Sequence, residues 1–252
     1  MLDETLTEVA EVARVIWELG WAERNAGNLS LDVTDTDTCP HEVALRKVGV
    51  PIPHREVAGR TFIVTITGSR FREIAQRPEE NVIVARISDE ADGYEILSEP
   101  TKKNSRLTSE FVSHLAVHAH LRRSDPAKRV VLHTHPDHLV ALTHLQQHTS
   151  GRALTDLLWA MHPEMKVVLP EGIGVVPYLR PGGDELAEAT VAELRDHRLV
   201  MWEKHGCIAV GEDLFEAFDL VDLADKCARL YFLVKSAGAD PQGLTPEQLE
   251  EL

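Results

Sequence analysis

The chain has 252 residues, 43% hydrophobic and 27% charged, and this length and composition predict one domain spanning residues 1–252. Its formal net charge of -15 argues against a broad surface for nucleic acid or an anionic membrane, but allows a local pocket for a small anion. Three widely spaced cysteines, Cys39, Cys207 and Cys227, and an acidic N-terminus without a membrane-spanning apolar run predict a cytoplasmic protein without disulfides.

Hydrophobic periodicity predicts an amphipathic helix over residues 3–19, where apolar residues recur at helical spacing and stop at Gly20. The next segment, 31–60, is rich in Asp, Thr, Pro and His and has no clear period, so we expect a meandering or exposed insertion. Strands are predicted at 61–65 and 82–87 because both runs are rich in β-branched and apolar residues.

The rest of the chain interleaves predicted helices and strands. The expected elements are a helix over 109–123, a strand over 130–135, a helical stretch over 139–145, a short strand over 166–169, a helix over 184–196, a strand pair around His205 and Gly206, and a helix over 213–236. This is an α/β pattern without the regular alternation of a doubly wound sheet. It also lacks GxGxxG and P-loop motifs, which disfavours nucleotide-cofactor chemistry.

The segment VVLHTHPDH contains the first candidate metal ligands. His133 and His135 would lie on the same face of a β-strand, next to Pro136, which ends the strand. With 13 histidines in 252 residues, about 0.7 such pairs arise by chance, so packing roles are the alternative. His118 and His120 fall in a predicted helix, where i and i+2 do not share a face, and we expect ordinary surface or packing roles for them.

A catalytic zinc ion usually has three protein ligands and one open position, so a third ligand must come from elsewhere. His205 is the best candidate because it lies between two strand-like apolar runs, and Gly206 permits a close or unusual backbone path at that junction. Cys207 competes with it, although a buried strand cysteine is more often a small apolar side chain. Taken alone, His205 could equally be structural.

Glu110, in the segment LTSEF, is the candidate acid or base. Thr108 or Ser109 is a good helix N-cap, which would place Glu110 in the first helical turn near the positive end of the helix dipole. A carboxylate in that position can serve capping alone. Beside a bound metal, it could instead take a proton from a substrate.

Two turns could bind a phosphate group. In ERNAGNLS, Asn25 and Asn28 flank a glycine, and in TITGSRFREIA the turn at Gly68 and Ser69 leads into a predicted helix. Backbone amides at a helix N-terminus with Ser and Gly form a common anion site. Each turn alone is a weak signal, because such short motifs occur in many loops.

The chain resembles the class II aldolase and adducin family in six segments that keep the family's order. They are RNAGNLS, TITGS, LTSEF, VVLHTHPD, LPEGIGVVPYLRPGGDELAEAT and EKHGCIAVGEDLFEAFDLVDLADKCARL. The resemblance runs from about residue 12 to about residue 238. It implies a single-domain α/β fold with a central, mainly antiparallel β-sheet flanked by helices. It also implies a homotetramer with active sites at subunit interfaces.

The resemblance implies a role for each matching residue. The ligands of one zinc ion per subunit would be His133, His135 and His205. Glu110 would be the catalytic acid/base, and Glu171 would be a second active-site carboxylate or would brace its loop through backbone amides. Phosphate and nearby substrate oxygens would be bound by Asn25, Asn28, Gly68, Ser69 and Ser109.

The long insertion between GNLS and the TGS strand resembles family members that cleave L-rhamnulose 1-phosphate into dihydroxyacetone phosphate and L-lactaldehyde. The alternatives on the same scaffold are L-fuculose-phosphate cleavage, pentulose-phosphate epimerisation, methylthioribulose-phosphate dehydration and an adducin-like binding module without catalysis. The intact histidine and glutamate set disfavours the binding module. Arg70 departs from the family, which often has Gly there, and could add a charge-assisted phosphate contact or alter the turn.

Overall fold

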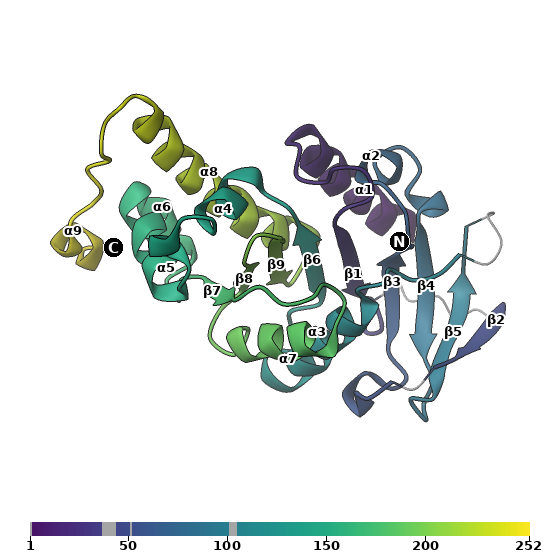
Figure 1. The fold of residues 1–252 in the computed structure, drawn as a ribbon. Helices are drawn as coiled ribbons and strands as arrows, with labels where there is room; N and C mark the ends of the chain where they lie inside the picture. The colour runs from purple at the N-terminus through teal and green to yellow at the C-terminus, as the bar shows by residue number, and fades with distance from the viewer. Residues whose placement is uncertain (1, 37–43, 51, 101–104) are drawn as a thin grey trace.

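The computed structural model describes residues 2–36, 44–50, 52–100 and 105–252, so Cys39 lies outside the described residues. Within them, nine strands form one sheet in the order β2-β5-β4-β3-β1-β6-β9-β8-β7 (Figure 1). Its strands are β1 Asn28–Asp32, β2 Arg46–Gly49, β3 Thr61–Thr65, β4 Val82–Ile87, β5 Gly93–Ser98, β6 Val130–Thr134, β7 Gly174–Val176, β8 Leu199–Trp202 and β9 Gly206–Gly211. In this described sheet, only β7 and β8 pair in parallel, which confirms the expected mainly antiparallel architecture.

Helices cover both faces of this sheet. They are α1 Leu2–Glu18, α2 Phe71–Ile74, α3 Phe111–Ser124, α4 Asp137–Leu142, α5 Gly151–Met161, α6 Pro163–Val168, α7 Asp184–Glu193, α8 Leu214–Ser236 and α9 Pro246–Glu250, with 3-10 turns at Arg55–Val57, Pro78–Glu80 and Gln146–His148. Helices α1 and α8 pack on one face, and α3 and α7 pack on the other (Figure 1). Among the helices that the structure describes, none combines the length and apolar character that a membrane span requires.

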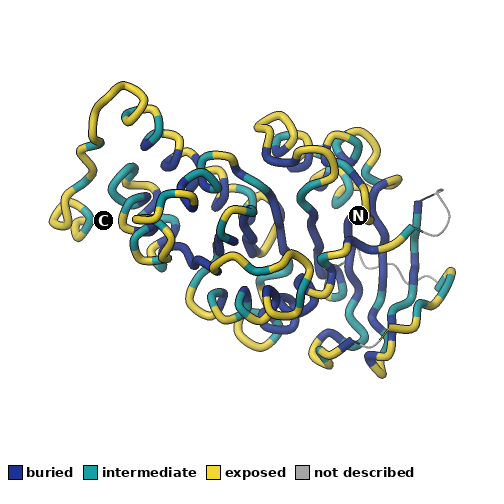
Figure 2. The backbone as a smooth tube through the Cα atoms, viewed as in Figure 1, coloured by how far each residue is buried: buried dark blue, intermediate teal, exposed yellow. Residues whose placement is uncertain are grey.

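The alternation of side chains along β1 and β6 explains where the polar residues lie. Leu29 and Leu132 face α1 and α8, whereas Val131 faces α3 and α7. Successive strand residues point to opposite faces, so Ser30 and His133 also face α3. Figure 2 shows that these central strands are buried along their whole length, while the segment that ends in α9 is largely exposed.

Several predicted elements are confirmed, including the first helix, the strands at 61–65 and 82–87, and the long helix that ends at Ser236. The strand predicted at 166–169 is wrong, because residues 166–168 belong to helix α6 and Leu169 is its C-cap. His162 caps α6 by accepting a hydrogen bond from the Glu164 amide at 3.2 Å, and proline follows as the first helical residue.

The predicted exposed insertion at 31–60 is also wrong at its start. The strand β1 continues through Leu31 and Asp32, both buried, and Asp32 forms an ion pair of 2.8 Å with Arg60. A second strand, β2, lies further along the same segment. The strand β1 was not predicted from the sequence because its alternating polar side chains suggested exposure to water. In the structure these side chains contact buried polar groups instead.

Candidate metal and active site

Three histidines meet at one end of the central strands. His133 is the fourth residue of β6 and His135 follows its end, and their Nε2 atoms lie 3.1 Å apart. His205 lies in the turn between β8 and β9, with its ring centroid 5.0 Å from that of His133 and 5.1 Å from that of His135. One potential ligand atom from each histidine falls within 4.8 Å of the others. The antiparallel pairing of β6 with β9 brings the distant third histidine to the first two.

The backbone around His205 follows an unusual path. Lys204, not Gly206, has the positive φ, at 61°. Gly206 is instead required by close approach, because a Cβ atom there would lie 2.6 Å from the Thr134 carbonyl oxygen and 2.6 Å from the His135 ring. The thiol of Cys207 is buried, and burial raises its pKa, so it suits packing rather than metal binding.

The histidine set fits a divalent metal ion. His133 Nδ1 donates to the Cys207 carbonyl oxygen at 2.8 Å, and His135 Nδ1 lies 3.2 Å from the Glu23 carboxylate, so each Nε2 is left as a ligand. His205 Nδ1 is buried and has no hydrogen-bond partner in the described part of the chain. Two nitrogens bound to one tetrahedral zinc lie roughly 3.3 Å apart, close to the observed His133–His135 separation.

Electrostatics also favour metal binding over protonation. Burial, followed by the neighbouring His135 and His205, lowers the pKa of His133 well below its usual value. Burial and His135 likewise lower the pKa of His205. A neutral imidazole is the form that binds a metal. The lowered pKa values therefore favour binding of a metal ion over binding of a proton.

Gly206→Ala should weaken metal binding on the order of 10-fold or more, because the new methyl group would displace the ring of His135 and the end of β6. Titration of metal into purified protein measures the effect. Gly49→Ala is the matched control, since nothing lies within 4 Å of a Cβ atom at that strand position. Unchanged metal affinity in Gly206→Ala would show that the site tolerates displacement.

Glu110 lies next to the histidines. Its Oε2 atom is 3.5 Å from His133 Nε2 and accepts a hydrogen bond from Asn28 Nδ2 at 2.5 Å. The register of β1 and β6 sets this arrangement by pairing Asn28 with His133. The predicted N-cap is wrong, because α3 begins at Phe111 and Glu110 itself occupies the cap position, without a side-chain capping bond in the described structure. The carboxylate is therefore turned toward the cluster.

A cavity of about 180 Å³ joins these groups to most of the predicted phosphate ligands. The predicted residues that line it are Asn25, Asn28, Gly68, Ser109, Glu110, His133, His135 and His205. Ser69 lines a neighbouring cavity instead, and its amide and hydroxyl both donate to the Ile66 carbonyl oxygen. The helix after this turn has only four residues, and Arg70 lies 3.6 Å from Glu73 rather than at the cavity.

Glu171 lies apart from this cavity in the described chain. Its Oε1 atom accepts a hydrogen bond from Arg198 Nε at 2.6 Å, and Arg198 also contacts Glu216. The loop is therefore braced through an arginine side chain and not through backbone amides. A catalytic role for Glu171 stays a prediction.

The structure adds residues that the sequence motifs did not single out. Thr67 lines the cavity and Glu23 contacts His135, and Thr108, which was predicted only as a possible helix N-cap, also lines the cavity. His114 reaches the site through Asn28, whose Oδ1 atom lies 2.5 Å from His114 Nε2. One signal was available in the sequence, because His114 follows Glu110 by four residues, about one helical turn.

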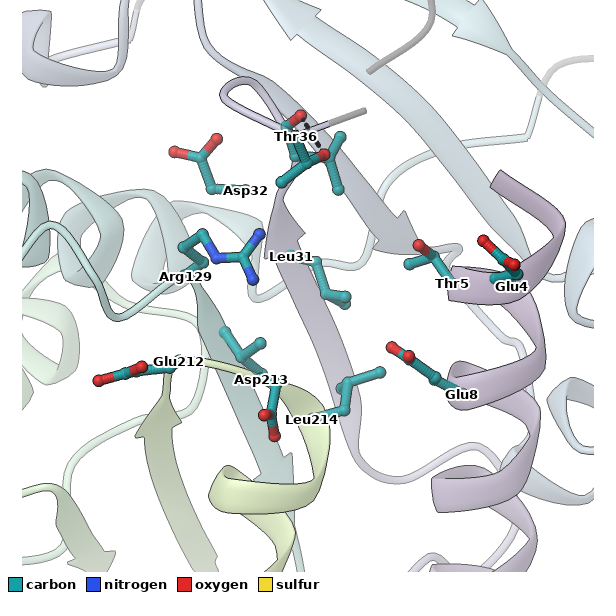
Figure 3. Close-up of a pocket in the computed structure, with 12 residues that line it drawn as sticks. Glu4, Thr5, Glu8, Leu31, Asp32, Thr36, Arg129, Glu212, Asp213 and Leu214 are labelled. Carbon is teal, nitrogen blue, oxygen red and sulfur yellow. Dashed lines mark hydrogen bonds between the residues drawn. The ribbon is translucent and has the colours of Figure 1, made fainter. Parts of the chain in front are cut away.

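A larger cavity, about 360 Å³, lies between α1, the end of β1 and the start of α8 (Figure 3). Arg129 lies on one side of it and Glu4 and Glu8, from α1, lie on the other, while Asp32 and Glu212 direct their carboxylates away from it. The acidic residues lining it are Glu4, Glu8, Asp32, Glu212 and Asp213. This excess of negative charge disfavours a phosphorylated ligand, so size alone does not identify the substrate site.

Comparisons with known proteins agree with this geometry. A family model described as Class II Aldolase and Adducin N-terminal domain matches residues 7–232. Rhamnulose-1-phosphate aldolase of Bacteroides thetaiotaomicron is 39% identical, with 100% of this chain and 93% of the relative covered. The enzyme of the same name from Listeria monocytogenes serovar 1/2a is 34% identical, with 98% and 91% covered.

Solved structures resemble the fold as well. A sugar-phosphate aldolase from Thermotoga maritima superposes with a TM-score of 0.83 at 32% identity, covering 96% of this chain and 99% of that one. An L-fuculose 1-phosphate aldolase gives a TM-score of 0.65 at 21% identity, covering 98% and 93%. At that identity, the second likeness concerns the fold alone.

Proposed function

The chain belongs to the class II aldolase and adducin family and is an aldolase, a carbon–carbon lyase, and we propose that it cleaves L-rhamnulose 1-phosphate. The products would be dihydroxyacetone phosphate and L-lactaldehyde. The observation that carries the proposal is the cluster of His133, His135 and His205 beside Glu110 in one cavity. The two relatives named rhamnulose-1-phosphate aldolase, similar over nearly the whole chain, support this substrate.

We propose that the three histidines hold one zinc ion per chain. A set of three neutral imidazoles with room for a further ligand is typical of catalytic zinc sites. When bound, zinc acts as a Lewis acid on the carbonyl and hydroxyl oxygens of the substrate. The hydrogen bonds that His133 Nδ1 and His135 Nδ1 donate to the Cys207 carbonyl oxygen and the Glu23 carboxylate would fix the two rings in their ligand orientation.

Glu110 moves the proton in this mechanism. In cleavage, Glu110 takes the proton of the hydroxyl on carbon 4 as the bond between carbons 3 and 4 of the ketose breaks. The oxygen on carbon 4 becomes the aldehyde oxygen, and the bonding electrons pass to an enediolate of dihydroxyacetone phosphate. Glu110 then delivers a proton to carbon 3, and in the synthetic direction it removes that proton. Its place 3.5 Å from His133 Nε2 supports this role, because the reacting carbon must lie beside the metal site.

Substrate phosphate would be bound at the mouth of the same cavity by Asn25, Gly68 and Ser109. Fixing the phosphate orients the reacting carbons and lowers the entropic cost of reaching the transition state. Asn28 is engaged by Glu110 and His114, which leaves one amide hydrogen for a substrate oxygen. Ser69 can contribute only if its bonds to Ile66 open, and its role stays a prediction.

L-Rhamnulose 1-phosphate should be cleaved with a kcat/KM about 10-fold higher than that of L-fuculose 1-phosphate. The two sugars differ in hydroxyl configuration, and one misplaced hydrogen bond to a hydroxyl costs about 1.4 kcal/mol. A coupled assay for dihydroxyacetone phosphate across a panel of ketose 1-phosphates measures the ratio. A reversed ratio would contradict the proposed substrate.

Product analysis separates the other enzyme functions. An epimerase or a dehydratase on this scaffold would give an isomeric or dehydrated sugar phosphate and no aldehyde fragment. A binding module of the adducin type would lack stoichiometric metal. We further propose a cytoplasmic homotetramer with active sites between subunits, in which the whole of residues 1–252 acts as one domain and Glu171 contributes a second carboxylate.

A further inference from the structure

We propose that His114 is a positioning residue for Glu110, acting through the side-chain amide of Asn28. This inference rests on the proposed catalytic role of Glu110. His114 does not line the cavity and would not touch the substrate. It belongs to a network of hydrogen bonds that ends on the carboxylate of Glu110.

The network crosses from helix α3 to strand β1 and back. His114 Nε2 lies 2.5 Å from Asn28 Oδ1, and Asn28 Nδ2 lies 2.5 Å from Glu110 Oε2. On its other side, His114 Nδ1 lies 2.7 Å from Ser30 Oγ, which is itself 2.8 Å from His118 Nε2. Five side chains from two segments distant in sequence, β1 and the start of α3, are thus connected in one line.

Chemistry fixes the direction of every hydrogen bond in this line. The Glu110 carboxylate accepts, so Asn28 must direct its NH₂ group toward Glu110 and its oxygen toward His114. That oxygen also accepts, so His114 carries its proton on Nε2 and accepts the Ser30 hydroxyl hydrogen at Nδ1. Ser30 in turn accepts from His118 Nε2. Each donor therefore points toward the catalytic carboxylate.

The same burial that isolates the network keeps its histidines neutral. Burial lowers the pKa of His114 to about 3 and that of His118 to about 4. A neutral imidazole has one donor and one acceptor nitrogen, which is the set that the line requires. A protonated His114 would have two donors, and Ser30 could then no longer donate to it.

The consequence is a single allowed orientation of the Asn28 amide. Rotating it by half a turn would place its oxygen against the Glu110 carboxylate and its NH₂ group against the His114 N–H. Without His114, the Asn28 oxygen would lose its partner and the amide could turn. Glu110 would then lose the hydrogen bond that holds it beside His133, and misplacing a catalytic group by about 1 Å can cost on the order of 100-fold in rate.

His114→Leu tests this role, because leucine fills similar space but cannot donate. We expect kcat to fall on the order of 10- to 100-fold, with bound metal nearly unchanged. His114→Gln supplies an amide N–H to Asn28 and should recover at least part of the lost turnover. The matched control is His120→Leu, a buried histidine on the same helix that bonds the Leu194 carbonyl oxygen, and its kcat should stay within about 2-fold of wild type.

The proposal is overturned if His114→Leu retains wild-type turnover, or if His114→Gln is as slow as His114→Leu. Should His114→Leu fail to fold, Ser30→Ala decides, because it removes only the hydroxyl that orients His114. A drop in kcat at unchanged metal content supports positioning, and wild-type turnover opposes it. Glu110→Gln in the same assay keeps the two proposals apart: full turnover there refutes the role of Glu110 itself.

Discussion

Glu110→Gln is expected to lower kcat by about 100-fold or more while the fold and most of the bound metal persist. Glutamine has nearly the same shape and can still meet Asn28, but it cannot carry the proton to carbon 3 of the substrate. The three histidines are untouched, so metal content should stay near one equivalent per chain. Single-turnover cleavage, measured together with metal content, separates a chemical defect from a loss of metal.

Two other outcomes would point to different roles for this carboxylate. Near-normal turnover would show that Glu110 does not move the proton, and would leave it only its structural hydrogen bond from Asn28. Complete loss of metal would make Glu110 a metal ligand. Glu185→Gln is the matched control, because Glu185 lies in the first turn of α7 and outside the residues lining the cavity, so its kcat should not change.

His205→Ala should lose metal binding first and activity as a consequence, whereas Glu110→Gln should lose activity and keep its metal. Only two of the three imidazoles would be left, so metal affinity should fall by more than about 100-fold and activity should disappear as a consequence. Excess zinc should restore part of the turnover, because Glu110 remains in place. Metal titration followed by activity assay checks both steps.

His144→Ala is a suitable control, since His144 is exposed and outside the histidine cluster. Its metal affinity and turnover should match wild type. If His205→Ala instead binds metal normally but does not turn over, His205 acts on the substrate and the proposed ligand set is wrong. This outcome would leave the family assignment intact.

The sequence predicted the first two histidines because the strand period places residues i and i+2 on one face. Strand periodicity could not predict that His205, about 70 residues further along the chain, lies beside them. Its place depends on which strands become neighbours, and the pairing of β6 with β9 is a property of the whole sheet. The resemblance to known family motifs filled that gap.

Polar residues misled the prediction around β1. The segment alternates polar residues with leucines, as in a strand with one solvent-exposed face; the polar residues are Asn28, Ser30 and Asp32. The polar residues that follow suggested an exposed loop. In the structure that face is buried under α3, where Ser30 bonds two histidines. A buried polar face cannot be recognised from one strand alone, because its partners lie far away in sequence.

Local competition explains the remaining differences. Val167 and Val168 favour a strand, but the proline and the capping histidine before them start a helix. The pairing of Glu171 with Arg198 depends on a loop that no periodicity describes. Such contacts between side chains distant in sequence are set only by the completed fold.

The most direct test of metal-dependent cleavage is a reconstitution titration of wild-type protein with L-rhamnulose 1-phosphate. Metal-stripped protein should release no dihydroxyacetone phosphate, and activity should rise with added zinc to a plateau at about one equivalent per chain. Full activity in a sample verified to contain no metal would contradict the account.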